Sequence, residues 1–436
     1  MAERKGVAED LASAALRSAW GFRIELAALA VLAAAWAGVR LAGGPVVASV
    51  AVAVPVAGLV AWPTFRHWAW RQLRAASVRR RFTAGMTAAG FDPDVEGTPS
   101  VLRVTETAAG YALWVRVPRG SSAAQLEKAA ETAAAAMGVA GLRVTRDRAN
   151  AALCTVAVVQ RDPLAATTPL AWPLADAAAL SLWEPIPVGV DEDGRQVTIS
   201  LPERNVLLGG EPGAGKSAAL SLLVAAAALD RSVKLWLFDG KRVELAAWAS
   251  CAERLVGPDL AEAADVLDAL RAEMDLRYAQ LLAWGRRKVT PDDGLGLHVV
   301  VVDELALYLA TGERKARDGL AESLRDLIAR GRAAGVIVLA ATQKPSSDVV
   351  PTSVRDLFGF RWALRCATRE ASDTIIGSGW AAEGHSAAEI DPALRGVGLL
   401  LHEGGQPVRL RAAYLDDPTI VRIAARATGL RRGPES

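Results

Sequence analysis

The residues with the clearest chemical potential form the run "GEPGAGKS", which follows the apolar stretch "NVLLG" and opens an Ala/Leu-rich segment. In a G-x-x-x-x-G-K-S pattern the glycines let the backbone curl, so that successive N–H groups face a chain of phosphates. The positive end of the helix that follows attracts the same negative charge. We therefore predict an ATP site with Mg²⁺, formed by Gly210, Glu211, Pro212, Gly213, Ala214, Gly215, Lys216 and Ser217.

Within this site, Lys216 is expected to reach the β and γ phosphates, and Ser217 to hold Mg²⁺. A second motif, "LHVVVVDELA", ends a buried strand with Asp303 and Glu304. Asp303 suits the Mg²⁺ shell, because this hard cation prefers carboxylates and water. Glu304 can orient and deprotonate the attacking water. The alternative interpretation of the pair is a solvated helix start.

A polar residue also ends the apolar run "GVIVLAATQ". We predict that this strand lies between the Asp303 strand and the strand before the phosphate loop. The amide of Gln343 would then face the γ-phosphate and the lytic water, and would report hydrolysis to the segment that follows. Without that placement, Gln343 is simply a polar residue at a strand edge.

Short apolar strands alternate with helical segments through residues 181–428. This order predicts an α/β domain whose mainly parallel sheet is covered on both faces. Before it, residues 82–165 show alternating strands around one Ala-rich helix, which predicts a small α+β domain.

The N-terminal region, residues 1–81, contains two uncharged runs, at 26–39 and 41–65, and transmembrane helices are predicted at about 24–42 and 44–63. The first helix spans the membrane only if Glu25 and Arg40 reach the interfaces. Arginines flank the pair on both outer sides, so both ends are expected on the cytoplasmic side of the cell membrane. A multi-pass anchor with the ATPase domain in the cytoplasm follows. A signal peptide or a buried helical hairpin are the alternatives.

Composition limits the function only loosely. The chain has 436 residues, a 52% hydrophobic share that can fill a sizeable core, and a net charge of +2. That charge is too balanced to indicate nucleic-acid binding by itself. The three cysteines lie far apart and suggest neither a disulfide framework nor a zinc site.

These motifs together resemble the FtsK/SpoIIIE family of DNA translocases, over about residues 100–424. The most specific segments are "IARGRAAGVIVLAATQKPSSDVV", "GFRWALRCATREASDTIIG" and the closing hairpin "GVGLLLHEGGQPVRLRAAYLDD". The resemblance implies a RecA-like P-loop ATPase that assembles as a homo-hexamer around double-stranded DNA. It also implies that Arg361 is the arginine finger for the neighbouring subunit's γ-phosphate, with Arg365 as a substitute. A simple ion pair is the alternative for Arg361.

The implied function is a membrane-anchored, ATP-driven translocase of double-stranded DNA, for intercellular transfer by conjugation or for chromosome or plasmid segregation. Pore residues stay open, with "RRK" at 286–288, Lys344 and the loop after it as candidates. Two departures from the family are expected: no C-terminal DNA-reading domain is predicted from the printed residues, and Leu307 stands where a second aspartate often stands. This favours a compact relative, similar to transfer proteins of actinobacterial conjugative elements. A protein-secretion ATPase and a nucleotide-gated membrane scaffold are the other function classes.

Overall fold

The computed structural model describes residues 36–37, 63–91, 97–147, 149–166, 168–343, 345–346 and 351–432. The chain divides into two compact units, residues 1–161 and 162–436. The two expected membrane helices lie almost entirely outside the described residues, so the anchor stays a prediction. Within the described ranges, no helix is both long and apolar enough to cross a membrane.

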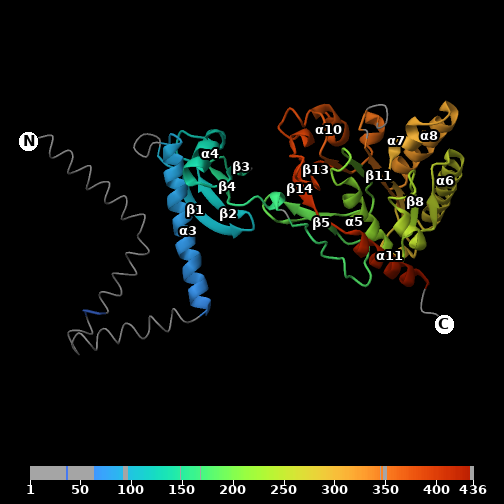
Figure 1. Ribbon diagram of the computed structural model, residues 1–436, viewed down its shortest axis with the longest axis horizontal. Coiled ribbons are helices and arrows are strands. Elements are labelled where there is room, and N and C mark those ends of the chain that lie inside the picture. The colour runs from blue at the N-terminus through green and yellow to red at the C-terminus, as the bar shows by residue number, and fades with distance from the viewer. Residues whose placement is uncertain are drawn as a thin grey trace, which may run out of the picture. The chain divides into compact units, whose positions relative to one another are not determined.

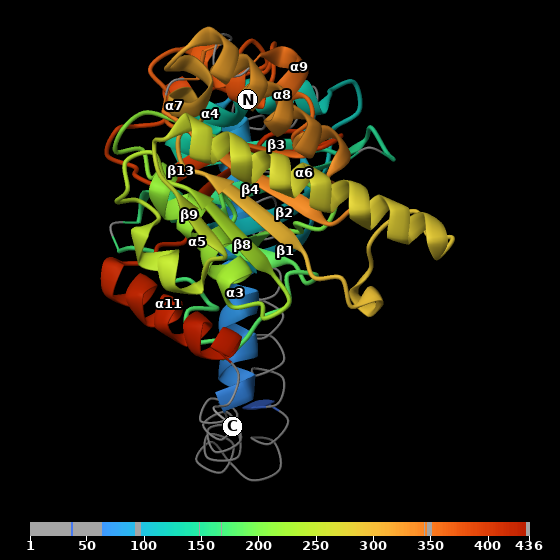
Figure 2. The same cartoon turned by 90° about the vertical axis from the view of Figure 1, so that its right-hand side faces the viewer.

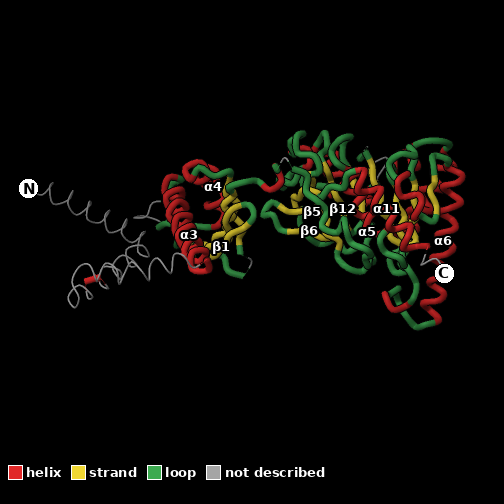
Figure 3. Tube along the Cα trace, turned by 60° about the horizontal axis from the view of Figure 1, so that its bottom comes forward, coloured by secondary structure: helices red, strands yellow, loops and turns green. Residues whose placement is uncertain are grey.

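In its described part, the first unit combines an antiparallel sheet of strand order β1-β2-β4-β3 with two helices, drawn beside the strands in Figure 3. Its core joins Val78 and Phe82 from the first helix to Leu113 and Leu126. The first helix therefore crosses the predicted domain boundary at residue 82. The elements are α3 (Pro63–Ala88), β1 (Ser100–Thr107), β2 (Gly110–Arg116), α4 (Ala123–Met137), β3 (Gly141–Arg146) and β4 (Leu153–Val159).

Local sequence explains where α4 begins and ends. The Ser122 side chain accepts from the Gln125 backbone N–H, and the Gln125 side chain accepts from the Ser122 N–H, which forms a capping box. Gly138 ends the helix in the left-handed conformation that favours glycine. Gly85 lets α3 approach α4, because a Cβ there would lie 2.9 Å from the Ala133 carbonyl oxygen.

The second unit is built on a ten-stranded sheet, counted within the described residues, of order β6-β5-β14-β13-β12-β7-β11-β10-β8-β9. The run from β12 to β9 is parallel, and the remaining strands join antiparallel. The strands are β5 (Ile186–Asp191), β6 (Gln196–Ile199), β7 (Val206–Gly209), β8 (Lys234–Phe238), β9 (Arg254–Val256), β10 (His298–Val302), β11 (Val336–Thr342), β12 (Phe360–Leu364), β13 (Val397–His402) and β14 (Val408–Ala412).

Both faces of this sheet are buried, as the predicted apolar strands require. Along β11, Ile337 and Leu339 belong to one core cluster, whereas Val336 and Val338 belong to the other. Successive side chains of a strand point to opposite faces, so a central strand covered on both sides is apolar throughout. Every residue of β11 is buried.

Helices from different parts of the chain cover the two faces. The helices α5 and α11 contribute to one core cluster, and α6, α7, α8 and α10 contribute to the other. Figures 1 and 2 show α11 on the opposite side of the sheet from α7 and α8. The α-helices are α5 (Lys216–Ala228), α6 (Leu260–Ala283), α7 (Leu305–Ala310), α8 (Arg314–Arg330), α9 (Thr352–Arg355), α10 (Arg369–Ile376) and α11 (Asp417–Arg432). Short 3-10 helices are η1 (Pro163–Ala165), η2 (Ala246–Cys251), η3 (Pro291–Asp293) and η4 (Ala387–Glu389).

The strand order confirms the predicted place of the Gln343 strand. Strand β11 pairs with β10 on one side and with β7 on the other, in parallel in both cases. The carboxyl ends of these three strands therefore meet at one edge of the sheet, where open α/β sheets place their ligands.

Candidate nucleotide site

The phosphate loop connects β7 to α5 in the predicted strand-loop-helix order. Gly213 and Gly215 have φ values of 80° and 103°, in the left-handed region that side chains disfavour. A Cβ on Gly215 would also lie 2.8 Å from the backbone of Gly396. Both the loop conformation and this close approach therefore depend on glycine at position 215.

Lys216 is the first residue of α5 and is 5% exposed. Its Nζ donates to the backbone carbonyl of Asp303 at 3.3 Å, which links the phosphate loop to the end of β10. Burial lowers the Lys216 pKa, while the carboxylates of Glu304 and Asp303 oppose that effect. A bound triphosphate would supply negative charge where burial now disfavours the ammonium.

Asp303 fits a role as a cation ligand. It is 1% exposed, and burial raises its pKa to about 6 even though Lys216 lies nearby. Within the described residues, its Oδ2 is buried without a hydrogen-bond partner. This oxygen could coordinate Mg²⁺. Ser217 is exposed at the pocket, and its hydroxyl could be a second ligand of the same ion. Mg²⁺ needs only one or two protein carboxylates when phosphates and water complete its shell.

Glu304 lies beside Asp303, and its carboxylate turns to the end of β11. Oε1 accepts from the Thr342 hydroxyl at 2.9 Å, and the Gln343 backbone N–H donates to Oε1 and Oε2 at 3.2 and 3.1 Å. The side chain also accepts from Ala306 N at 3.4 Å, which caps α7. Glu304 thus begins a helix, as the alternative interpretation held, but its side chain is buried and not solvated.

Gln343 follows β11 and lines the nucleotide pocket. Its position at the shared edge of β7, β11 and β10 is the one that the sensor hypothesis requires. The hydrogen bonds to Glu304 come from its backbone N–H, whereas the hypothesis assigned the contact with phosphate and water to its side-chain amide. The relay itself stays a prediction.

Arg361 and Arg365 occupy different ends of β12. Arg361 pairs with Leu207 in the register with β7, and its Nη1 lies 3.4 Å from Asp356 Oδ1. It is absent from the described lining of the nucleotide pocket. The ion pair proposed as the alternative role is thus present within the chain, and the finger role toward a neighbouring subunit stays a prediction.

Arg365 binds the phosphate loop of its own chain. Its Nη1 lies 2.7 Å from Glu211 Oε2, and its carbonyl accepts from the Glu211 backbone N–H at 2.9 Å. Because this contact belongs to the chain's own site, Arg365 does not behave here as a free substitute for the finger.

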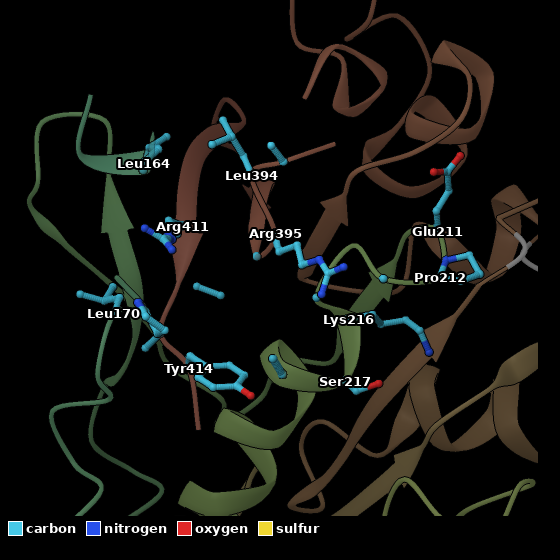
Figure 4. A pocket seen from close by; sticks show the side chains of 18 of the residues that line it. Leu164, Leu170, Glu211, Pro212, Lys216, Ser217, Leu394, Arg395, Arg411 and Tyr414 are labelled. Atoms are coloured by element: carbon cyan, nitrogen blue, oxygen red, sulfur yellow. The ribbon is translucent and has the colours of Figure 1, made fainter. Parts of the chain in front are cut away.

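A pocket of about 950 Å³ opens beside the loop and is lined by its residues from Glu211 to Gly213 and from Gly215 to Ser217. Sequence reasoning missed several of its other side chains. Arg395 extends toward the phosphate loop, and Arg411 and Tyr414 lie farther from the loop (Figure 4). Lys241 and Glu244 also line it. Arg395 could not be assigned from the sequence, because no known motif connects it to a phosphate loop some 180 residues earlier.

The segment that carries Arg395 is fixed by backbone hydrogen bonds. Gly396 N donates to Ala214 O at 2.9 Å, and Ala412 N donates to Gly396 O at 2.8 Å. The phosphate loop, the start of β13 and the end of β14 are thereby connected, which holds Arg395 at the pocket.

This fold and this site define a P-loop ATPase domain, with the nucleotide pocket at the carboxyl ends of parallel strands. The FtsK/SpoIIIE family profile matches residues 181–298, from the start of this domain to the first residue of β10.

Relatives of this domain include two curated proteins. DNA translocase FtsK of Streptomyces coelicolor is 29% identical over 262 residues, covering 54% of this chain and 27% of that protein. DNA translocase SftA of Bacillus subtilis is 30% identical over 258 residues, covering 55% and 26%. The chain therefore spans about a quarter of the length of these relatives.

A solved structure, the pCW3 conjugation coupling protein TcpA in monomer form with ATPgS, is similar over a larger share of the chain. It aligns with a TM-score of 0.52 at 18% identity, covering 81% of this chain and 99% of that one. At this identity the likeness concerns the fold.

Proposed function

We propose that this chain is an ATP-driven motor that translocates double-stranded DNA. The observation that supports it is the grouping of Lys216, Asp303, Glu304 and Gln343 at the ends of three adjacent parallel strands, inside a domain that the FtsK/SpoIIIE family profile matches over residues 181–298. The curated relatives of this domain carry the name DNA translocase.

The chain's own residues would divide the hydrolysis of ATP among them. Backbone N–H groups of the loop and Lys216 bind the phosphates, and Ser217 and Asp303 would hold Mg²⁺, which supplies charge neutralisation when bound. Glu304 takes a proton from the attacking water, and Gln343 senses the γ-phosphate.

We further propose a homo-hexameric ring with Arg361 reaching the neighbouring site, anchored to the cell membrane by residues 24–42 and 44–63. A ring could bind DNA despite the net charge of +2, because each copy needs to supply only a few basic residues. The movement would serve intercellular DNA transfer by conjugation, or segregation of a chromosome or plasmid.

The decisive experiment measures ATP turnover of the full chain in mild detergent with long duplex DNA, single-stranded DNA or no DNA. We expect the highest rate with duplex DNA, and none from Glu304→Gln, which should still bind a fluorescent ATP analogue. Turnover that no form of DNA changes would contradict the translocase and favour a secretion ATPase of the same superfamily. ATP binding without turnover would favour a nucleotide-gated scaffold.

Anchoring is tested separately by a chain that begins at Pro63, the first residue of α3. This start keeps Val78 and Phe82 in the core of the first unit, whereas a cut at residue 82 would remove most of α3. We expect the shortened chain to leave the membrane fraction. A product that stays in the membrane pellet would rule out residues 1–62 as the sole anchor.

A further inference from the structure

The Glu304 carboxylate is occupied by donors from the end of β11. The Thr342 hydroxyl, the Gln343 N–H and the Ala306 N–H all reach Oε1, and the Gln343 N–H also reaches Oε2. An ionised carboxylate offers about four acceptor positions, so most of this capacity is taken. The group that should receive a proton from water is thus engaged with the protein.

The same carboxylate lies outside the pocket that would hold the nucleotide. Among the described residues, those lining the pocket include Lys216, Ser217 and Gln343 but not Glu304, which is only 9% exposed. A general base must lie within hydrogen-bond reach of the water that it deprotonates. In this position the carboxylate is directed to the end of β11, and a turn of the side chain would bring it to a water in the pocket.

We propose that Thr342 is a positioning residue that holds Glu304 in a resting position, and that nucleotide turnover requires release of this hydrogen bond. The inference rests on the proposed role of Glu304 as the general base. Thr342 is fully buried in the last position of β11, so its hydroxyl is held rigidly at the carboxylate. Both partners are withdrawn from bulk water, which strengthens the hydrogen bond.

Gln343 can connect release to occupancy of the pocket. Its backbone N–H binds Glu304, and the same residue lines the nucleotide pocket. A contact between its amide and a phosphate would shift the backbone that holds the carboxylate. A resting position of this kind limits hydrolysis to sites in which a nucleotide is correctly bound.

The test compares Thr342→Val and Thr342→Ser in the full chain without DNA. Valine has nearly the same shape as threonine and lacks the hydroxyl, whereas serine keeps it. Loss of one hydrogen bond to a charged group shifts a two-state equilibrium about tenfold or more. We expect kcat of Thr342→Val to rise about threefold to tenfold, with affinity for a fluorescent ATP analogue unchanged, and Thr342→Ser to resemble the wild type.

A rise in kcat would indicate that the Glu304 carboxylate has been released, because a merely structural defect would lower turnover or nucleotide affinity. Thr342→Ala repeats the loss of the hydroxyl without the added methyl group, and the same rise is expected. Thr87→Val removes an exposed hydroxyl in α3 of the first unit, which donates to the Thr83 carbonyl at 3.1 Å, and provides the matched control.

The inference is overturned if both hydroxyl-free variants turn over at or below the wild-type rate. Because these rates are measured without DNA, they are independent of the translocase proposal. A wild-type chain that ignores DNA would count against that proposal, and the Thr342 comparison would still decide the resting position.

Discussion

Arg365 and Glu211 form an ion pair of 2.7 Å between the end of β12 and the phosphate loop. Each side chain is 26% exposed, and a backbone hydrogen bond joins the same two residues. Without its partner, the Glu211 carboxylate would be a negative charge beside the phosphates. Arg365 therefore compensates an acidic residue that the loop carries at a variable position of its motif.

This pair predicts a compensating double substitution. Arg365→Ala should weaken ATP binding about threefold to tenfold, because it leaves Glu211 unpaired near the phosphates. Adding Glu211→Gln should restore most of the affinity, as measured by titration with a fluorescent ATP analogue. Arg369→Ala breaks a more exposed 2.7 Å pair with Glu389 and should leave affinity unchanged. Failure of Glu211→Gln to restore binding would show that Arg365 contacts the nucleotide directly.

The buried carboxylate of Asp303 is expected to lower the folding stability of the chain in the absence of a bound cation. Burial raises its pKa to about 6, so between about pH 4 and 6 the folded chain retains a proton that the unfolded chain has released. Folding stability attributable to this group therefore falls as the pH rises through that window. At pH 7.5 without Mg²⁺, Asp303→Asn should stabilise the chain by on the order of 2 kcal/mol, and this gain should disappear near pH 4.

Thermal unfolding checks this expectation, with and without Mg²⁺ and ATP. The wild type should gain more stability from Mg²⁺ and ATP than Asp303→Asn does. Asp239→Asn is the contrasting control, because that buried carboxylate already accepts from Leu245 N at 2.8 Å. It should lose stability at pH 7.5. Equal effects of the two substitutions would contradict the assignment of Asp303 as an uncompensated acid.

Much of the site follows from sequence because its motifs are local. The loop at 210–217 and the pair Asp303 and Glu304 each stand at the end of an apolar strand, and parallel strands bring such ends together. The contacts of Glu304 with Thr342 were not predicted. Although Thr342 adjoins Gln343, only the register and the rotamers determine whether a hydroxyl, a backbone N–H or an amide meets the carboxylate.

Two features of the fold could not be predicted from the local sequence pattern. The closing hairpin β13–β14 was recognised, but its insertion between β12 and β5 depends on strands about 220 residues apart in sequence. The arginines of α3 were interpreted as a cytoplasmic flank, which is compatible with the helix. That interpretation did not reveal that Val78 and Phe82 pack into the core of the first unit.

Gly85 and Gly429 predict opposite effects of the same substitution. Alanine normally stabilises a helix interior relative to glycine by about 1 kcal/mol. At Gly85 the added Cβ would lie 2.9 Å from Ala133 O, so α3 would be pushed from α4. At Gly429 in α11 nothing lies within 4 Å. Calorimetry of the full chain should show Gly85→Ala lowering the unfolding temperature and Gly429→Ala raising or preserving it, and two changes of the same sign would contradict the close approach.

Substitution of Arg361 is expected to lower ATP turnover by more than the loss of its ion pair with Asp356 can explain. If it stabilises the transition state in a neighbouring subunit, Arg361→Ala should lower kcat about 100-fold or more while ATP affinity stays close to that of the wild type. Asp356→Asn removes the partner of the 3.4 Å ion pair and leaves the guanidinium in place. It should retain turnover within about twofold, with some loss of thermal stability.

Mixing two inactive chains then distinguishes action between subunits from action within one. Arg361→Ala chains keep an intact phosphate loop, and Lys216→Ala chains keep Arg361. In the proposed ring, a mixture of the two would contain interfaces with both parts intact. We expect the mixture to hydrolyse ATP faster than either variant alone, with a maximum near equal proportions. An inactive mixture of chains that still co-assemble, or an equal loss in Asp356→Asn, would reduce Arg361 to the ion pair seen within the chain.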